Sequence, residues 1–199
     1  MRTAQPGKEP PDAEQIKLAV YGTPLPEPLR VEGPVRGAFT SASTEQWAYL
    51  LIRADRDNSM IAVFDTVQRE ASDEPAETDK ARADASPRRR GELLSQFVTD
   101  EPYMSMPAAI DIDSSGGNGD EQKLDELLLI QYGYQMGVSL ASVDIVSLAG
   151  SRYAEVATEP FVLRDSCNST LPDRAFRASR LRVTEGGALE RDDFETECP

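Results

Sequence analysis

The side chains best suited to chemistry are oxygen-bearing residues that crowd into one glycine-rich stretch, residues 111–122. They recur at alternate positions, and Gly116 follows at the sixth position, where a sharp turn would bring the oxygens together. Carboxylate and hydroxyl oxygens at this spacing are ligands for a hard cation such as calcium. The candidate ligands are Asp111, Asp113, Ser115 and Glu121.

This stretch partly resembles a calcium-binding loop of the EF-hand type, and the resemblance covers these twelve residues alone. It departs from the pattern at the twelfth position, where Gln122 replaces the bidentate glutamate, and at the eighth, where Asn118 replaces an apolar residue. The alternative interpretation is a polar turn that leads into a helix capped by Asp120. We favour the turn because of these departures. We therefore expect no cofactor and keep calcium as the alternative.

Histidine is absent from the chain. This removes the usual general base at neutral pH and the commonest nitrogen ligand of zinc, and it excludes histidine-type serine and cysteine triads. The glycines of residues 116–119 also lack the lysine and the serine or threonine of a phosphate-binding loop. We therefore expect that the protein is not an enzyme. An enzyme that uses carboxylates or a bound cation remains the alternative.

Two arginine clusters interrupt the acidic sequence. Residues 88–90 are interpreted as a solvated charged loop. The second cluster recurs roughly every third residue, which would place several side chains on one face and favours a contact with a protein over a nucleic-acid track. Its members are Arg174, Arg177, Arg180 and Arg182.

The two cysteines, Cys167 and Cys198, lie far apart and lack the close spacing of a metal or redox motif. A disulfide between them, closing the C-terminal segment, is an option in an oxidising compartment. Residues 168–170 match a glycosylation sequon, which we interpret as a chance match because no secretion signal is visible.

Acidic residues outnumber basic ones by 35 to 21, which gives a net charge of −14. This charge disfavours nucleic acid and anionic membranes, so we expect protein partners in a homo- or hetero-oligomer. Residues 1–12 have no apolar core, and no apolar run approaches the length of a membrane span, so we expect neither a signal peptide nor an anchor. We expect a soluble protein, located in the cytoplasm or within an assembled particle.

Hydrophobic patterning predicts a β-hairpin with arms 47–54 and 60–67 around a polar turn. It predicts helices over residues 92–98 and 120–131, and either a buried strand or a second helix over residues 138–148. Further strands or extended segments are predicted over residues 16–21, 104–112, 153–156, 161–163 and 181–184.

These elements alternate irregularly, which favours an α+β fold, mainly an antiparallel sheet with a few helices. The predicted organisation is a flexible N-terminal arm at 1–15, a single domain at 16–190 and an acidic tail at 191–199. Prolines between residues 22 and 34 predict an extended arm. Residues 70–91 are predicted to be a disordered, mobile acidic insert, because almost nothing in them can be buried.

The function expected from these features is that of a non-catalytic structural or interaction subunit of a larger assembly, for example a virion shell component. Extended arms commonly gain their order by lying on a neighbour. The alternatives are an acidic inhibitor that mimics a polyanion, and the carboxylate- or cation-dependent enzyme considered above.

Overall fold

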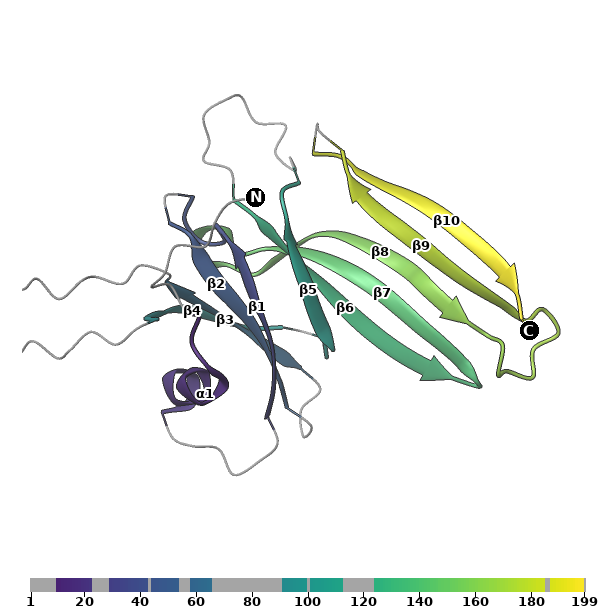
Figure 1. Ribbon diagram of the computed structural model, residues 1–199, viewed down its shortest axis with the longest axis horizontal. Helices are drawn as coiled ribbons and strands as arrows, with labels where there is room; N and C mark the ends of the chain where they lie inside the picture. Colours follow the sequence, from purple (N-terminus) through teal and green to yellow (C-terminus); the bar gives the residue numbers. More distant parts are fainter. Residues whose placement is uncertain are drawn as a thin grey trace, which may run out of the picture.

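The computed structural model describes residues 10–22, 29–42, 44–53, 58–65, 91–99, 101–112, 124–184 and 187–198. Within these residues the chain forms one α-helix, a short 3-10 helix and ten β-strands arranged in two antiparallel sheets (Figure 1). The fold is therefore nearly all-β, and the predicted α+β class with a few helices is wrong. None of the helical residues that the structure describes forms a helix long and apolar enough to cross a membrane.

The first sheet has four strands in the order β1-β2-β3-β4. Its two central strands confirm the predicted hairpin, with Trp47 opposite Phe64 and Leu50 opposite Ile61. Both strands are buried on both faces, as expected for a sheet covered on each side. The strands are β1 (Leu29–Gly37), β2 (Gln46–Arg53), β3 (Ser59–Asp65) and β4 (Leu93–Val98).

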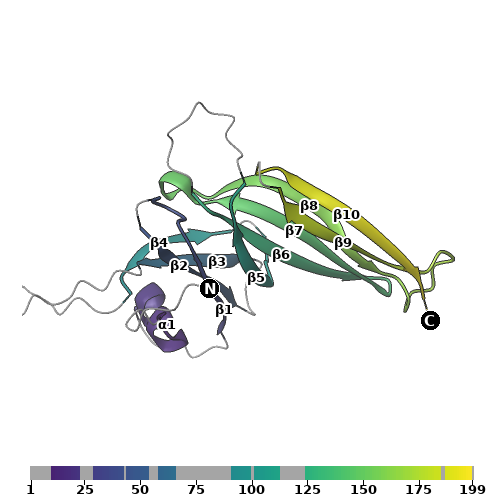
Figure 2. The same ribbon diagram turned by 45° about the horizontal axis from the view of Figure 1, so that its top comes forward.

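Helix α1 (Ala13–Tyr21) covers the outer face of this sheet (Figure 2). Asp12 caps its start and exchanges hydrogen bonds with Gln15 in a capping box, and Gly22 ends it with a φ of 72°. Ile16 is 1% exposed and belongs to the apolar cluster on that face. The strand predicted over residues 16–21 is wrong, because caps at both ends and burial of one helical face outweigh the local strand pattern.

The second sheet has six strands in the order β10-β9-β8-β7-β6-β5, all antiparallel. Their bounds are β5 (Ser105–Ile110), β6 (Glu126–Gln135), β7 (Val138–Ser147), β8 (Ala154–Asp165), β9 (Ala175–Val183) and β10 (Leu189–Glu197). The 3-10 helix, Ala149–Ser151, lies between β7 and β8. Extended structure near residues 104–112 is confirmed, and residues 138–148 form a strand rather than a second helix.

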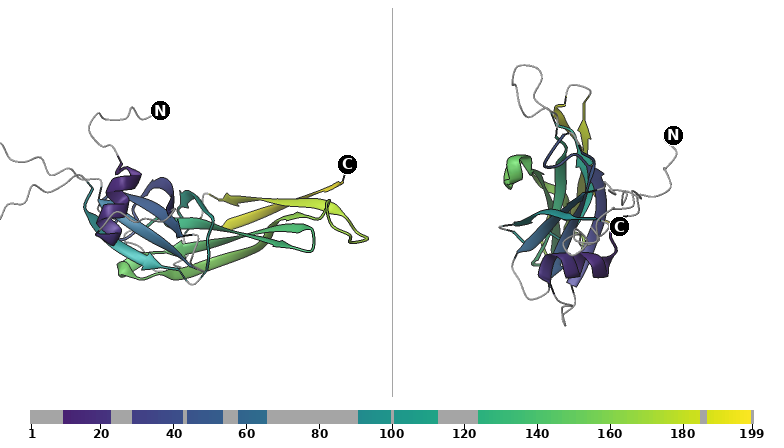
Figure 3. Two further views of the ribbon diagram at one scale, coloured as in Figure 1. Left: turned by 90° about the horizontal axis from the view of Figure 1, so that it is seen from below. Right: turned by 90° about the vertical axis from the view of Figure 1, so that its left-hand side faces the viewer.

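The main core lies between the inner faces of the two sheets. Leu50, Ile61 and Val63 of the first sheet share one buried cluster with Leu127, Leu129 and Val146 of the second. Among the described residues of the second sheet, those that take part in this packing belong to β5, the start of β6 and the end of β7. The remainder extends well beyond the first sheet (Figures 1 and 3). We call this remainder the projecting sheet; it contains the β6–β7 turn, the connection at residues 166–174 and the β9–β10 hairpin.

Three further predictions of local structure are corrected. Residues 92–98 were expected to be helical but form β4, which pairs with β3 and buries Phe97 in the main core. The helix predicted over residues 120–131 gives way to β6 in its described part, because Leu127 and Leu129 alternate toward the core and pair with β7. The tail predicted at 191–199 is largely β10, paired along its whole length with β9.

The predicted extended arm at residues 22–34 becomes part of β1, which pairs with β2 from Leu29 onward. Residues 23–28 of that arm, and residues 1–9 of the predicted N-terminal arm, lie outside the described residues. The predicted insert at 70–91 also lies outside them, apart from Gly91.

Candidate functional site

The strands of the projecting sheet align their side chains in rows across five strands. One row runs through Tyr132, Ala141, Leu163, Ala178 and Phe194, from β6 to β10. The neighbouring row runs through Gly133, Leu140, Arg164, Arg177 and Glu195 and points to the opposite face, because side chains alternate along a strand.

One face of the projecting sheet carries exposed aromatic rings. Tyr132 is 56% exposed and Tyr134 is 74% exposed, although both belong to regular strand positions. Phe176 and Phe194 lie on the same face, and the Arg180 guanidinium sits 5.5 Å from the Phe194 ring centroid. We call these four residues the aromatic face. Large apolar patches on a surface often mark sites of protein contact.

The opposite face carries a groove of about 320 Å³ near the end of the projecting sheet. Its lining is mostly apolar, with one amide and one guanidinium, which is the usual composition of a binding site. We call it the distal groove, and its lining residues are Gln135, Met136, Val138, Leu140, Phe161, Arg164 and Leu171.

Two groove residues adopt backbone angles that side chains rarely tolerate. Met136 has a φ of 52° and Phe161 a φ of 54°, and they are the only non-glycine residues with positive φ among those described. Met136 and Gly137 form the two-residue turn between β6 and β7, where asparagine normally precedes the glycine. Backbone conformations of this kind cluster at functional sites because local stability alone does not favour them.

Phe161 owes its position to an irregularity in β8. Ala141 pairs with Leu163 and Val143 pairs with Glu159, so β8 spans this gap with three residues against one in β7. Such a bulge re-aims the side chains around it. The Arg191 guanidinium holds the bulge from the neighbouring hairpin by donating to the carbonyl oxygens of Pro160 and Phe161, at 3.0 and 3.4 Å.

Arg164 is the single charged residue of the groove lining. In its cross-strand row it lies between Leu140 and Arg177. Arg177 is neutralised by Glu195 at 3.1 Å, whereas no acidic side chain within the described residues pairs with Arg164. Like charges directly opposite each other are unfavourable, so this arrangement leaves a cation that an anion would stabilise.

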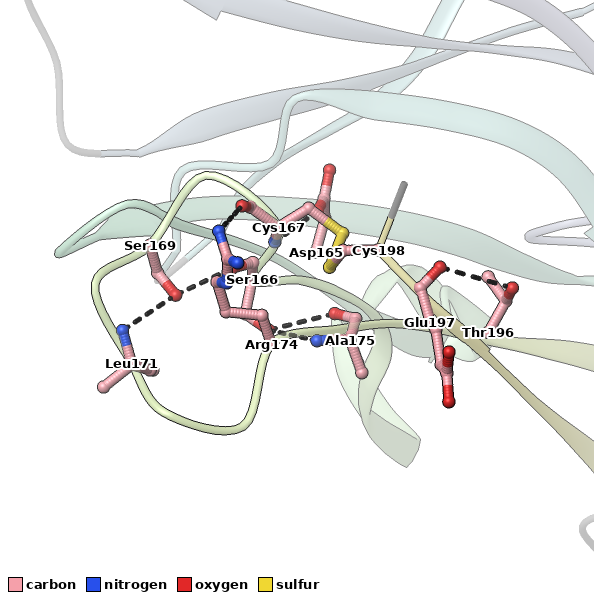
Figure 4. The surroundings of a disulfide bond; sticks show 10 residues. All are labelled: Asp165, Ser166, Cys167, Ser169, Leu171, Arg174, Ala175, Thr196, Glu197 and Cys198. Atoms are coloured by element: carbon pink, nitrogen blue, oxygen red, sulfur yellow. Dashed lines mark hydrogen bonds between the residues drawn. A yellow bond between two sulfur atoms is a disulfide. The ribbon is translucent and has the colours of Figure 1, made fainter.

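The disulfide between Cys167 and Cys198 ties the 166–174 connection to the end of β10 (Figure 4). Hydrogen bonds order the same connection: the Ser169 hydroxyl donates to the Ser166 carbonyl at 2.7 Å, and the Leu171 amide donates to the Ser169 hydroxyl at 3.3 Å. Leu171 of this connection lines the groove. The disulfide therefore anchors one wall of the groove.

The β6–β7 turn also contacts this connection closely. A Cβ added to Gly137 would lie 2.8 Å from the carbonyl oxygen of Asn168 and from the Cα of Ser169. Since Gly137 also has a φ of 80°, only glycine fits there. The turn that presents Met136 and the connection that presents Leu171 are thus held together.

Of the predicted calcium ligands, only Asp111 is described, and its side chain is exposed. Asp113, Ser115 and Glu121 lie outside the described residues, so calcium binding stays a prediction. Within the parts of the chain that are described, no cluster of three or more carboxylate or cysteine side chains could hold a metal ion.

The predicted arginine cluster lies on and next to the β9–β10 hairpin. Strand alternation places Arg180 and Arg182 on the aromatic face and Arg177 on the other, so the four do not share one face. Arg182 pairs with Glu190 and Asp192, and Arg174 donates to the carbonyl oxygen of Cys167. Several of these arginines therefore hold the hairpin together, and their role in a protein contact remains a prediction.

A buried carboxylate, Asp144, lies where the projecting sheet leaves the core. It accepts hydrogen bonds from Tyr103 at 2.8 Å, Gln131 at 3.1 Å and Thr158 at 2.7 Å. Burial raises the pKa of the Tyr103 hydroxyl, so it stays a donor at all ordinary pH values. These contacts satisfy the carboxylate as a structural anchor between the two parts of the second sheet.

Sequence reasoning missed Met136, Phe161, Arg164 and Leu171. The signal that could have found the first of them is the alternating pattern on both sides of Met136-Gly137, which is that of two strands joined by a tight turn. The other three come together only through strand register and the 166–174 connection. No protein-family model, curated protein or solved structure matches this chain.

Proposed function

We propose that this protein is a non-catalytic interaction subunit that binds another protein through the projecting sheet and thereby joins a larger assembly. The observation that carries the proposal is the concentration of exposed apolar side chains on a part of the sheet that lies beyond the core. Tyr132, Tyr134, Met136 and Phe161 are all more than half exposed there. Burying one large apolar side chain contributes about 1.5–3 kcal/mol, so a partner that covers several of them gains substantial affinity.

The projecting sheet is also ordered before any partner arrives. Strand β6 pairs with β7, and β9 with β10, in continuous ladders, ion pairs cross the β9–β10 hairpin, and a disulfide closes its open end. A surface that is already ordered loses little conformational entropy on binding. These features support a docking role more than a catalytic one, and they add to the absence of histidine from the chain.

The test is a substitution on the aromatic face, introduced in the organism that makes the protein. Replacing Tyr134 and Phe194 with serine should release the chain from its native complex, as measured by sedimentation of a gentle extract. The matched control is Leu94→Ser, which removes a 41% exposed apolar side chain from the first sheet. Circular dichroism of each purified variant checks that the fold is intact.

A complex that keeps its mass in the double variant would contradict the proposal, as would a wild-type chain that sediments as a 21.8 kDa monomer in the native extract. Ionic strength separates this proposal from polyanion mimicry. A contact built on apolar burial persists as salt is raised, whereas the affinity of a mimic collapses.

A further inference from the structure

We infer that the distal groove binds a peptide segment of the partner protein that presents a carboxylate next to an apolar side chain. This inference rests on the proposed function and deepens it, since it names what the partner inserts. The groove lies on the opposite face from the rings tested above. The two experiments therefore distinguish a failure of the groove from a failure of the aromatic face.

The charge of the groove selects the occupant. Its lining holds one guanidinium, Arg164, and no carboxylate, on a chain whose net charge is −14. A guanidinium presents two parallel N–H donors that match the two oxygens of a carboxylate. Arg177, the neighbour of Arg164 in its row, is already occupied by Glu195, so Arg164 is the group left to receive the anion.

The apolar lining supplies the second half of the recognition. Val138 and Leu140 contribute strand positions on the groove face, while Met136 and Leu171 approach from the turn and the anchored connection. A volume of about 320 Å³ is at the small end of ligand pockets and suits a short segment rather than a folded domain. An apolar side chain and an adjacent carboxylate would together satisfy this lining.

The backbone provides an independent indication that this place binds something. Both described non-glycine residues with positive φ, Met136 and Phe161, line this one groove. Each presents a large side chain that is more than half exposed. A tight turn and a bulge would form at lower cost with asparagine, so folding alone does not account for these two side chains.

The experiment titrates small probes into the full, disulfide-bonded chain labelled with nitrogen-15 and follows amide shifts by NMR. N-acetyl-phenylalanine mimics a chain terminus, and N-acetyl-Asp-Phe amide mimics an internal acidic residue. Their neutral counterparts are N-acetyl-phenylalanine amide and N-acetyl-Asn-Phe amide. We expect saturable shifts at the groove amides, with at least one acidic probe binding about tenfold or more tightly than its neutral counterpart.

Two variants localise the effect. Arg164→Gln should abolish the preference for the acidic probe, and Met136→Asn should weaken both the acidic and the neutral probe. Leu94→Ser, on the first sheet, serves as the unaffected control. The relative affinity of the two acidic probes identifies the source of the carboxylate.

Equal binding of acidic and neutral probes, or no binding up to their solubility limit, overturns the inference. So does a preference that survives Arg164→Gln. Light scattering of the protein alone tests a second copy as occupant: a mass that rises with concentration in the wild type but not in Arg164→Gln would overturn the assignment to a different protein.

Discussion

Met136 occupies the first position of a two-residue turn with a φ of 52°, and its side chain is 76% exposed. In this turn the backbone favours asparagine, whose short polar side chain tolerates the left-handed region. Methionine buries little of its side chain here, so we expect the strained turn to lower the stability of the isolated protein. The Met136 side chain in the distal groove is therefore suited to contact with a partner and does not stabilise the fold.

Replacing Met136 with asparagine should raise the free energy of unfolding by about 1 kcal/mol, because the strained turn relaxes. Urea denaturation of the purified variant measures this change. Met136→Leu keeps both the apolar side chain and the strain, so it should unfold like the wild type. A less stable Met136→Asn variant would show that the methionine contributes to the fold.

Glu126 makes the stability of the folded protein depend on pH. The residue is 5% exposed, and burial raises the pKa of its carboxyl, opposed by the Ile112 amide that donates to it at 3.0 Å. Because the pKa is higher in the folded state, the folded chain holds this proton more tightly than the unfolded chain. Its contribution to stability is therefore complete below the unfolded pKa, about 4.3, and is lost as pH rises through the folded value.

Glu126→Gln should consequently be more stable than the wild type at neutral pH, since glutamine keeps an acceptor for the Ile112 amide without the buried charge. The difference should disappear below the unfolded pKa of the glutamate. Urea unfolding of both proteins across this pH range is the measurement. A variant that is less stable at neutral pH would mean that the ionised carboxylate is stabilising.

At the scale of elements, the β9–β10 hairpin is attached to the rest of the sheet by few contacts. Only three residue pairs join β8 to β9, from Leu163 with Ala178 to Asp165 with Phe176. Arg191 adds a clamp on the β8 bulge by donating to the carbonyl oxygen of Pro160. Hydrogen bonds that Asp193 accepts from Ser179 and Arg191 lower the pKa of its carboxyl. The disulfide lies just beyond the β8–β9 pairs, at the open end of the hairpin, so the hairpin is held at that end and by the Arg191 clamp rather than along a full ladder.

Replacing Cys198 with serine should loosen this hairpin and the wall that carries Leu171. In the chain-entropy model, a bridge across 31 residues is worth about 3–4 kcal/mol of global stability. We expect faster amide hydrogen exchange in β9, β10 and the 166–174 connection, with little change in β2 and β3, and weaker binding of the acidic probes. Unchanged exchange in β9 and β10 would show that the strand pairs alone hold the hairpin.

At the scale of the whole molecule, the protein consists of two regions with different properties, a packed core region and the projecting sheet. Helix α1 and the first sheet bury their apolar faces against each other and against the base of the second sheet, which stabilises the fold. The projecting sheet is held rigid by strands that continue into that core. Asp144 and the residues that donate hydrogen bonds to it lie at the boundary between the two regions. The outer part can therefore expose apolar side chains without losing its shape.

Several features follow from local sequence alone. The absence of histidine needs no structure, and the β2–β3 hairpin is predictable because both arms alternate and a polar turn separates them. Local patterns misled elsewhere. The apolar run around Leu127 and Leu128 fits a helix as well as a buried strand, and the charged residues of β10 resemble a tail until their arginine partners on β9 are known.

The distal groove forms only in the tertiary structure. Arg164, Phe161 and Leu171 come from a strand, a bulge and a connection, and strand register together with the Cys167–Cys198 bridge brings them beside Met136. Propensity and periodicity report on a residue and its near neighbours, whereas register is set by burial across paired strands. The sequence alone therefore excludes histidine-dependent chemistry, whereas strand pairing determines which of the remaining side chains come together.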